Sequence, residues 1–450
     1  MNYPVWNVPI LGSGLVVAII AIIHILISHL AVGGGAFLAV AEWWASRQAD
    51  PERIRAFLRK FVTYFLVYTT VFGATTGVGI WFSIQLANPE ATSLLIHQFV
   101  FAWATEWVTF IGELTVLYFY YYGWHTNSRR MQLVLAILYF VIAWFSLFII
   151  NGILTFMLTP GGWTLENRDI VAGFFNPGYW PILFIRTLVM LALAGLFAFV
   201  VATRVDDDLK ERIIAFATRF VLPAALLIPL FAAWYWFSLP VETHKMWHNG
   251  IVGVAGGRLE AITRYSWLAA ITGGLIVIGT LIIAWKPRAT TTTAAIALLA
   301  TAQLGILGGE FFREMGRKPF VVRGVLYSNG LWKAPSKAPV ALDQPYFEST
   351  RWEPDHATPG SAAHGEWIYR LQCASCHTLD GYRSLAGRTA QWTPGFGDRF
   401  LQNLNQQGVM PPFQGDSQDR AALVAYLISL HGKPVSAAEV EAALAREVKP

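Results

Sequence analysis

Charged residues are scarce in this sequence. Asp, Glu, Lys and Arg together make up 14% of its 450 residues, whereas soluble proteins carry about a quarter. Hydrophobic residues reach 55%, and the 19 Trp, 30 Phe and 16 Tyr suit membrane interfaces and cofactor pockets. A soluble chain could not bury that much apolar surface, so the composition predicts a membrane protein.

Cysteine is scarcer still, because only Cys373 and Cys376 are present. Two cysteines exclude a disulfide-rich fold, and their spacing is too short for an ordinary structural disulfide. Lys and Arg exceed Asp and Glu by 33 to 28, but they form no basic run interleaved with aromatic residues. Nucleic acid is therefore not an expected partner.

Long apolar stretches are abundant. A transmembrane helix needs about 20 apolar residues, and eight stretches meet that length. The first has a long apolar start and no small-residue cleavage site, so we predict a retained signal-anchor helix. We expect an all-α, polytopic membrane bundle with spans near 10–45, 61–87, 94–123, 131–158, 180–203, 220–239, 265–285 and 290–312.

The basic residues of the connecting loops predict the orientation of the bundle. Thirteen Lys and Arg fall in the loops that follow the first, third, fifth and seventh spans, and four fall in the opposite loops. By the positive-inside rule the N-terminus lies outside. An even number of spans places the C-terminal tail outside as well, and lipid surrounds the bundle.

Hydropathy falls sharply after the last span, which predicts three regions. Residues 1–320 form the transmembrane domain. Residues 321–360 form a linker, and its 333–360 part is rich in Pro, Ser and Asp and has little core-forming content. Residues 361–450 form a small α-helical domain with a C-terminal tail.

The segment Cys373-Ala-Ser-Cys376-His377 is the attachment sequence for a c-type haem. Two thiols on one helical turn can each form a thioether with a porphyrin vinyl group, and His377 then reaches the iron. A redox-active or zinc-binding CxxC is the alternative interpretation. The surrounding helices AAHGEWIYRLQ and DRAALVAYLISL resemble those of class I cytochromes c.

The loop Gly408-Val-Met410-Pro-Pro-Phe413 resembles the distal-ligand loop of class I cytochromes c. This resemblance implies that Met410 binds the haem c iron opposite His377; otherwise Met410 is a surface or core side chain. A thioether ligand raises the reduction potential of a haem, which suits an electron carrier.

Titratable side chains inside membrane spans are costly, so each is a functional candidate. His24 and His29 in the first span lie about 140° apart around a helix and cannot bind one metal from one face. A helix–helix hydrogen bond or an ion pair with an arginine is the structural alternative to a haem, metal or proton site. The other candidates are Glu106 and Glu113 on one face of the third span, Arg186 in the fifth, and Glu310, Glu314 and Arg317 at the end of the eighth.

The segment HILISHLAVGGGAFLAVAE, from His24 to Glu42, resembles the first helix of subunit I of cytochrome bd-type oxidases. The similarity covers about 320 residues. It continues through GATTGVGIWF, ELTVLYFYYYGW and Asn151-Gly152, and it ends with EMGRKPF from Glu314 to Phe320, which is similar to the family's Glu-x-Gly-Arg-Gln-Pro-Trp.

This resemblance implies roles for individual residues. His24 matches a haem-ligating histidine, and Glu314 matches the ligand of the second haem of a di-haem site. Glu106 and Glu113 match glutamates of the proton path or haem environment, and Arg317 is expected near haem propionates. The implied cofactors are one covalent haem c and two non-covalent haems, either haem b with haem d or two haems b.

The sequence departs from the family where the low-spin haem and quinol should bind. Arg186 stands where the family has a haem-ligating histidine, and no methionine lies near Ser266. Arginine has no lone pair for iron, so we expect Arg186 to pair with a haem propionate or a carboxylate. Glu310 stands where the family often has Trp.

The outer loop 240–264 is short and lacks the family's quinol-binding pattern, and the haem c domain stands in place of a ninth helix. We therefore expect electrons from a periplasmic cytochrome c or another periplasmic donor, received through haem c. His244 and His248 would share a helix face and could bind a haem or metal, although a hydrated loop is the simpler interpretation. His29 and His97 are further candidates for an extra haem.

The sequence thus predicts a terminal oxidase that reduces dioxygen to water in the bacterial cytoplasmic (inner) membrane, with its haem c domain in the periplasm. A second bd-like membrane subunit is an expected partner. The alternatives are an electron-transfer subunit of a larger redox complex without oxygen chemistry, and a haem-based nitric oxide or peroxide reductase.

Overall fold

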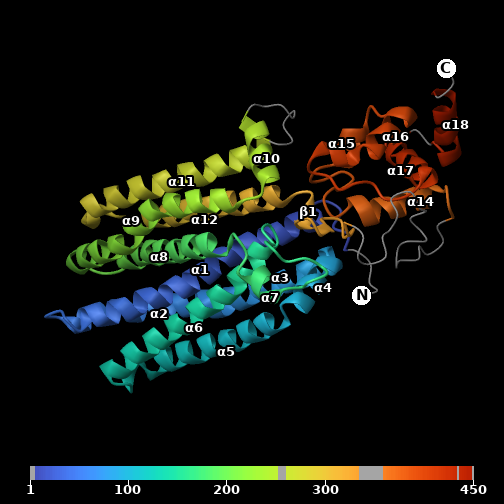
Figure 1. Ribbon diagram of the computed structural model, residues 1–450. Coiled ribbons are helices and arrows are strands. Elements are labelled where there is room, and N and C mark those ends of the chain that lie inside the picture. Colours follow the sequence, from blue (N-terminus) through green and yellow to red (C-terminus); the bar gives the residue numbers. More distant parts are fainter. Residues whose placement is uncertain (1–5, 252–259, 334–357, 433–434, 448–450) are drawn as a thin grey trace. The chain divides into compact units, whose positions relative to one another are not determined.

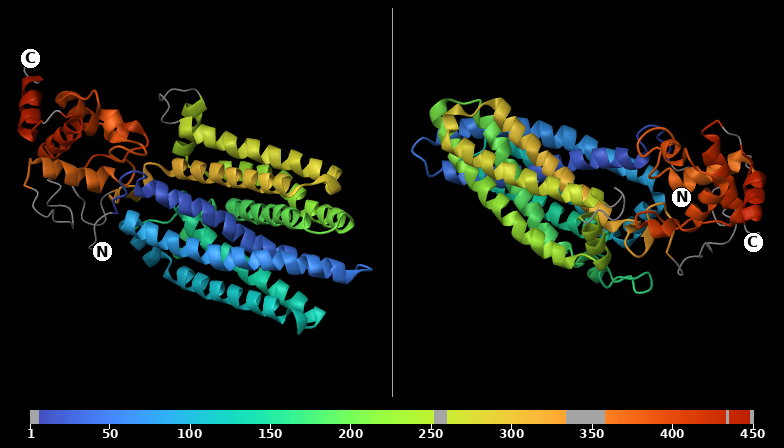
Figure 2. Two further views of the ribbon diagram at one scale, coloured as in Figure 1. Left: turned by 180° about the vertical axis from the view of Figure 1, so that it is seen from behind. Right: turned by 90° about the horizontal axis from the view of Figure 1, so that it is seen from above.

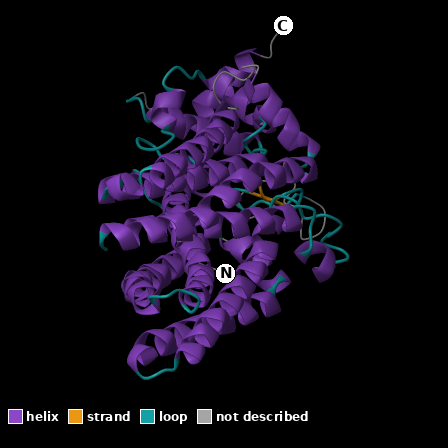
Figure 3. Ribbon diagram, turned by 90° about the vertical axis from the view of Figure 1, so that its left-hand side faces the viewer, coloured by secondary structure: helices purple, strands orange, loops and turns teal. Residues whose placement is uncertain are grey.

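The computed structural model describes residues 6–251, 260–333, 358–432 and 435–447, and helices account for most of them (Figure 3). Within these residues, eight helical stretches are long and apolar enough to cross a membrane. They confirm the predicted all-α bundle of eight spans. The stretches are Ser13–Ala45, Pro51–Ala87, Val100–His125, Arg129–Phe156, Tyr179–Ala202, Asp207–Ser238, Ala261–Trp285 and Thr292–Arg317.

Two helices begin well before their predicted spans. The second starts at Pro51 and the sixth at Asp207, so most of the two basic segments expected to be loops is helical. Pro51 occupies the first turn, where proline is tolerated, and the Asp206 side chain accepts a hydrogen bond from the Leu209 backbone N–H at 3.1 Å. Arg and Lys are good helix formers, which explains why the helices continue through the basic residues.

The chain forms two compact units. The larger, Ala21–Val78 and Ile96–Gly316, holds long helices that run side by side (Figures 1 and 2); α8 packs most extensively on α9, and α5 on α6. Its elements are α1 (Ser13–Ala45), α2 (Pro51–Val67), the π-helix Tyr68–Gly73, α3 (Ala74–Ala87), α4 (Pro89–Gln98), α5 (Val100–Tyr122), α6 (Arg129–Phe156), α7 (Ile170–Phe174), α8 (Tyr179–Ala202), α9 (Asp207–Ser238), α10 (Val241–Ile251), α11 (Glu260–Trp285), α12 (Thr292–Arg317) and the 3-10 turns Gly123–His125 and Pro287–Ala289. Helices α1, α3, α4 and α12 extend beyond the unit.

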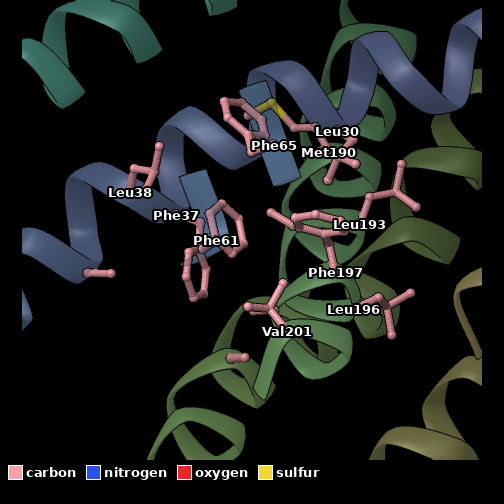
Figure 4. Close-up of a cluster of buried hydrophobic side chains, with 14 of the residues drawn as sticks. Leu30, Phe37, Leu38, Phe61, Phe65, Met190, Leu193, Leu196, Phe197 and Val201 are labelled. Carbon is pink, nitrogen blue, oxygen red and sulfur yellow. The ribbon is translucent and has the colours of Figure 1, made fainter. Parts of the chain in front are cut away.

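Aromatic rings fill the core where α1, α2 and α8 meet (Figure 4). Phe37 stacks on Phe61 with ring centroids 4.9 Å apart, and Phe61 meets Phe197 edge to face at 5.1 Å. A Cβ on Gly33 would lie 1.9 Å from the Met190 carbonyl oxygen, so only glycine fits there. The glycine run of α1 therefore permits the close helix contacts that small residues provide in membranes.

The smaller unit comprises Met1–Ile20, Gly79–Leu95 and Arg317–Pro450. Helix α14 packs on α17 around a core that includes Ile368, Leu401 and Leu423, and two short antiparallel strands begin the predicted linker. Linker residues 334–357 lie outside the described residues. The further elements are β1 (Phe320–Val322), β2 (Leu326–Tyr327), α14 (Ala362–Ile368), the π-helix Tyr369–Cys373, α15 (Leu385–Thr389), α16 (Pro394–Gln402), the 3-10 turn Leu404–Gln407, α17 (Ser417–Ser429) and α18 (Ala437–Glu447).

Candidate functional site

His24 lies on α1 and is held in one orientation. Its Nδ1 is 2.9 Å from the Thr76 Oγ1, and that hydroxyl donates to the Phe72 carbonyl at 2.6 Å. Since the hydroxyl proton is directed to Phe72, Nδ1 donates to Thr76, which leaves Nε2 as the nitrogen with a lone pair for iron. A Cβ on Gly77 would come within 3.3 Å of the His24 ring, so glycine leaves room beside it. This donor set fits a haem ligand.

His29 is buried, with 3% of its surface exposed. Its Nδ1 donates to the Ile25 carbonyl at 2.8 Å, a bond within its own helix. It also interacts electrostatically with Arg186 and Glu310. His24 and His29 therefore have different surroundings, as their spacing predicts.

Arg186 on α8 is buried and pairs with Glu310 on α12, as expected for an arginine without access to water. Its Nη2 lies 3.9 Å from the Glu310 Oε1, and Arg313 approaches the same carboxylate at 2.8 Å. The Arg313 Nη1 is buried and has no hydrogen-bond partner among the described residues. Two guanidinium groups face this carboxylate, and Arg313 also interacts electrostatically with Glu314. The Arg313 Nη1 could donate a hydrogen bond to an anionic group such as a haem propionate.

Glu106 and Glu113 on α5 are brought together by Ser146 on α6. The Ser146 hydroxyl is 3.4 Å from the Glu106 Oε1, and Glu113 interacts with the same side chain. The i,i+7 spacing predicts that the two glutamates share one helix face, but nothing in the sequence indicates Ser146, because a single serine in an apolar helix has no distinguishing pattern. The three side chains form a polar string between two apolar helices.

Glu314 lies in the last turn of α12, which ends at Arg317. The Thr243 hydroxyl donates to the Gly316 carbonyl at 2.8 Å, and a Cβ on Gly316 would lie 3.0 Å from the Thr243 Cγ2. The Arg317 Nη1 donates to the Val321 carbonyl at 2.9 Å. The Glu-Met-Gly-Arg motif therefore occupies a braced helix end, and Thr243 is a contact that its sequence did not indicate.

The short loop between the sixth and seventh spans contains a helix. Residues Val241–Ile251 form α10, so the hydrated-loop interpretation was wrong for this part. His244 stacks on Trp236 with ring centroids 4.4 Å apart, and its Nε2 lies 3.0 Å from the Trp236 carbonyl. That bond occupies one ring nitrogen of His244. His97 is in the last turn of α4 and is exposed.

The CxxCH segment follows the π-helical turn Tyr369–Cys373, and both cysteines are free and half-buried. The His377 Nδ1 donates to the Arg383 carbonyl at 2.9 Å, and the Tyr369 hydroxyl donates to the His377 carbonyl at 3.1 Å. The first bond places the ring proton on Nδ1 and makes Nε2 the metal-binding nitrogen. Two thiols beside an oriented imidazole fit a c-type haem.

The alternative chemistries of the CxxC segment find less support. Burial, with the nearby Cys376 as a smaller contribution, raises the pKa of the Cys373 thiol to about 12. A redox-active CxxC needs a lowered thiol pKa instead. No cluster of three or more His, Cys, Asp and Glu side chains suited to a metal ion occurs among the described residues.

Two glutamines join the CxxCH segment to the loop that carries Met410. The Gln372 Nε2 donates to the Gln414 carbonyl at 2.6 Å, and the Gln414 backbone N–H donates to the Gln372 Oε1 at 3.0 Å. Met410 itself is half-buried. A buried His364–Asp419 contact of 2.8 Å further joins α14 to α17. Sequence analysis missed these pairs because their members lie 42 and 55 positions apart.

Comparisons with known proteins agree with both parts of this description. Residues 360–427 match the family of cbb3-type cytochrome c oxidase subunit III. The structure of bd oxidase from Geobacillus thermodenitrificans is similar in fold, with a TM-score of 0.60 at 17% identity, over 69% of this chain and 88% of that chain. The comparison with curated proteins gives no match.

Residues 13–237, half of the chain, match the family of cytochrome bd terminal oxidase subunit I. This match and the C-terminal cytochrome match confirm the resemblance read from the His24–Glu42 and CxxCH segments. They also imply haem cofactors and an oxidoreductase. On these grounds the chain belongs to the cytochrome bd terminal oxidase subunit I family.

Proposed function

We propose that this protein is a terminal oxidase subunit that receives electrons from a periplasmic c-type donor through haem c and reduces dioxygen to water in the membrane domain. Four electrons and four protons convert one dioxygen molecule into two water molecules. The proposal requires a covalent haem c and two non-covalent haems, which supply one-electron and oxygen chemistry when bound.

The pairing of Arg186 with Glu310 carries the proposal. Arg186 stands at the position where the family has the histidine of its low-spin haem, and its guanidinium faces a carboxylate. Arginine cannot ligate iron, so the low-spin haem that usually receives electrons from quinol lacks an iron ligand at this position. A c-type cytochrome domain in the same chain would supply a different entry point for electrons.

The residues of the chain divide the remaining work. His24 and Glu314 would hold the irons of the two membrane haems, and His377 and Met410 would hold the iron of haem c. Glu106 and Glu113 would pass protons, with Ser146 hydrogen-bonded to Glu106 and interacting with Glu113. Arg317 and the guanidinium groups of Arg186 and Arg313 would balance the negative charge of haem propionates.

The same proposal places the chain in a bacterial inner membrane with both termini in the periplasm. The basic residues of the inner loops support this orientation. Many large apolar side chains remain exposed on the long helices, including Phe101, Phe237 and Trp285. Lipid and a second bd-like membrane subunit would cover these surfaces.

Oxygen consumption by the purified protein tests the proposal. We expect consumption with a reduced soluble cytochrome c, and a reduced optical spectrum with a c-type band, with a red chlorin band only if one membrane haem is haem d. His377→Ala should lose turnover with this donor while the non-covalent haems remain bound. His431→Ala is the matched control, since His431 belongs to the same domain and hydrogen-bonds Thr389.

Full-rate quinol oxidation by His377→Ala would contradict the c-linked route. A protein that accepts electrons from cytochrome c but consumes no oxygen would support the electron-transfer alternative. Consumption of nitric oxide or peroxide instead would support the reductase alternative.

A further inference from the structure

The segment that leads into α1, together with the first two residues of that helix, contacts the haem c attachment region through its backbone. The Tyr382 backbone N–H donates to the Ile10 carbonyl at 2.8 Å. Residues 6–14, here called the N-terminal strap, contain a turn closed by a 2.9 Å bond from the Gly12 N–H to the Val8 carbonyl. Gly12 has φ +75°, a conformation that favours glycine.

Glycines on both sides allow the two backbones to meet. A Cβ on Gly381 would lie 1.9 Å from the Ile10 carbonyl oxygen, and one on Gly14 would lie 2.9 Å from the Ser375 carbonyl oxygen. A Cβ on Gly12 would lie 3.3 Å from the Thr378 Cγ2. Three close approaches at separate glycines, together with a hydrogen bond, make this a packed contact.

The strap contacts the chain on both sides of the haem-ligand candidate His377. Ser375 lies within the CxxCH segment, and residues 378–383, here called the histidine turn, follow it. In this turn the Thr378 hydroxyl donates to the Tyr382 carbonyl at 3.0 Å and accepts from the Gly381 N–H at 2.8 Å. The last residue of the turn, Arg383, accepts a hydrogen bond from the His377 ring through its carbonyl. The strap is therefore coupled to the orientation of His377.

The strap is also tied to the membrane helices. The Trp6 N–H donates to the Leu86 carbonyl at 3.2 Å, and the Trp6 ring meets Phe82 edge to face, both at the end of α3. At its other end the strap enters α1, which continues unbroken from Ser13 and carries His24. The strap is therefore fixed on α1 and α3 and offers its backbone to the histidine turn.

We propose that the N-terminal strap is an intramolecular docking site for the cytochrome c domain, which holds the histidine turn on the start of α1. Its consequence for catalysis rests on the proposed function: with haem c and the membrane haems bound, the strap would keep the transfer of one electron from haem c to a membrane haem within one chain. Gly14 and Gly381 act as positioning residues, because neither side of the contact tolerates a side chain.

Two variants test the strap from opposite sides in the full-length holoprotein. Gly14→Ala adds a methyl group against Ser375 but favours the helix in which it lies, so α1 should persist. Gly381→Ala adds a methyl group against Ile10. The matched controls are Gly273→Ala in α11, where a Cβ would meet no described atom within 4 Å, and Gly387→Ala, where the nearest atom is 3.8 Å away.

The first measurement is hydrogen exchange in the peptide that contains Tyr382. Loss of its bond to Ile10 should speed exchange of that amide by about fivefold or more in both strap variants, and the controls should match wild type. The second is the rate at which membrane haems are reduced after photoreduction of haem c. This rate should fall in both variants with unchanged haem content, and the double variant should be no slower than the slower single variant, because both remove one contact.

Exchange and transfer rates equal to wild type in both strap variants would overturn the proposal. If Gly381→Ala loses haem c, the result for Gly14→Ala alone tests the proposal, because that substitution lies outside the cytochrome domain. Neither measurement uses oxygen or an external donor. If both strap variants change the exchange and transfer rates but the protein consumes no oxygen, the proposed function would be rejected and the docking proposal would stand.

Discussion

The guanidinium of Arg186 lies 3.9 Å from the carboxylate of Glu310, and Arg313 reaches that carboxylate from the same helix at 2.8 Å. One half-buried carboxylate thus faces two guanidinium groups, of which that of Arg186 is buried. Removal of the carboxylate and removal of Arg186 should have very different effects. The first leaves the buried Arg186 without the carboxylate that it faces, whereas the second leaves Glu310 paired with Arg313.

Glu310→Gln should destabilise the protein strongly, by about 3–5 kcal/mol, the cost of breaking a buried ion pair. Arg186→Gln should cost less, because Glu310 keeps Arg313. Thermal unfolding in detergent measures both, and Glu211→Gln, in an exposed pair with Arg288, should cost less than about 1 kcal/mol. Equal losses in the two buried variants would contradict this account of the cluster.

His24→Ala and His29→Ala should differ in haem content, because we expect His24 to be a haem ligand and His29 to be a structural histidine. The His24 Nε2 fits an iron ligand, so its loss should remove one of two non-covalent haems. His29→Ala should keep both, since its Nδ1 bond to Ile25 lies within α1. Haem extraction and the pyridine haemochrome spectrum give the counts. An unchanged count in His24→Ala, or three non-covalent haems in the wild type, would refute the assignment.

Gln372→Ala should loosen the loop of Met410. The substitution removes both hydrogen bonds between Gln372 and the Gln414 backbone, each worth about 0.5–1.5 kcal/mol. We expect weaker thioether ligation and a lower reduction potential of haem c, since a methionine ligand raises it. Redox titration measures the change, and Gln406→Ala, whose exposed amide bonds Asn403 at 2.9 Å, should leave the potential unaltered.

Asp50 should give the stability of the bundle a dependence on acid pH. The Arg212 guanidinium donates to both Asp50 oxygens, at 2.7 and 2.8 Å, and these bonds hold the pKa of Asp50 below its ordinary value of 3.8. A lowered folded-state pKa stabilises the fold above the ordinary value, and this contribution disappears as pH falls through the lowered pKa.

Asp50→Asn should therefore lower Tm by roughly 1–3 °C at pH 7, and the difference should vanish in strong acid. Thermal scans across pH test this, with Glu441→Gln on the exposed side of α18 as the control. A difference between Asp50→Asn and wild type that persists after Asp50 is protonated would show that the bidentate ion pair is not its cause.

Local residue patterns determined much of this protein in advance. Eight apolar runs specify eight membrane helices, because a helix that satisfies its own backbone is the structure such a run can adopt in lipid. The CxxCH motif and the His24–Glu42 segment identify the family, since each is a contiguous set of residues. Arg186 excludes an iron ligand at its position by its chemistry alone.

Only the tertiary structure decided which distant residues meet. Arg186 pairs with Glu310, Gln372 with Gln414, and Ile10 with Tyr382. The members of each pair are far apart in the sequence, and no local pattern specifies that they meet. The structure likewise places His244 on a helix, stacked on Trp236, which its sequence did not indicate. Such pairings depend on how helices pack, and packing is set by the shapes of many side chains together, such as the rings around Phe37 and the glycines of α1.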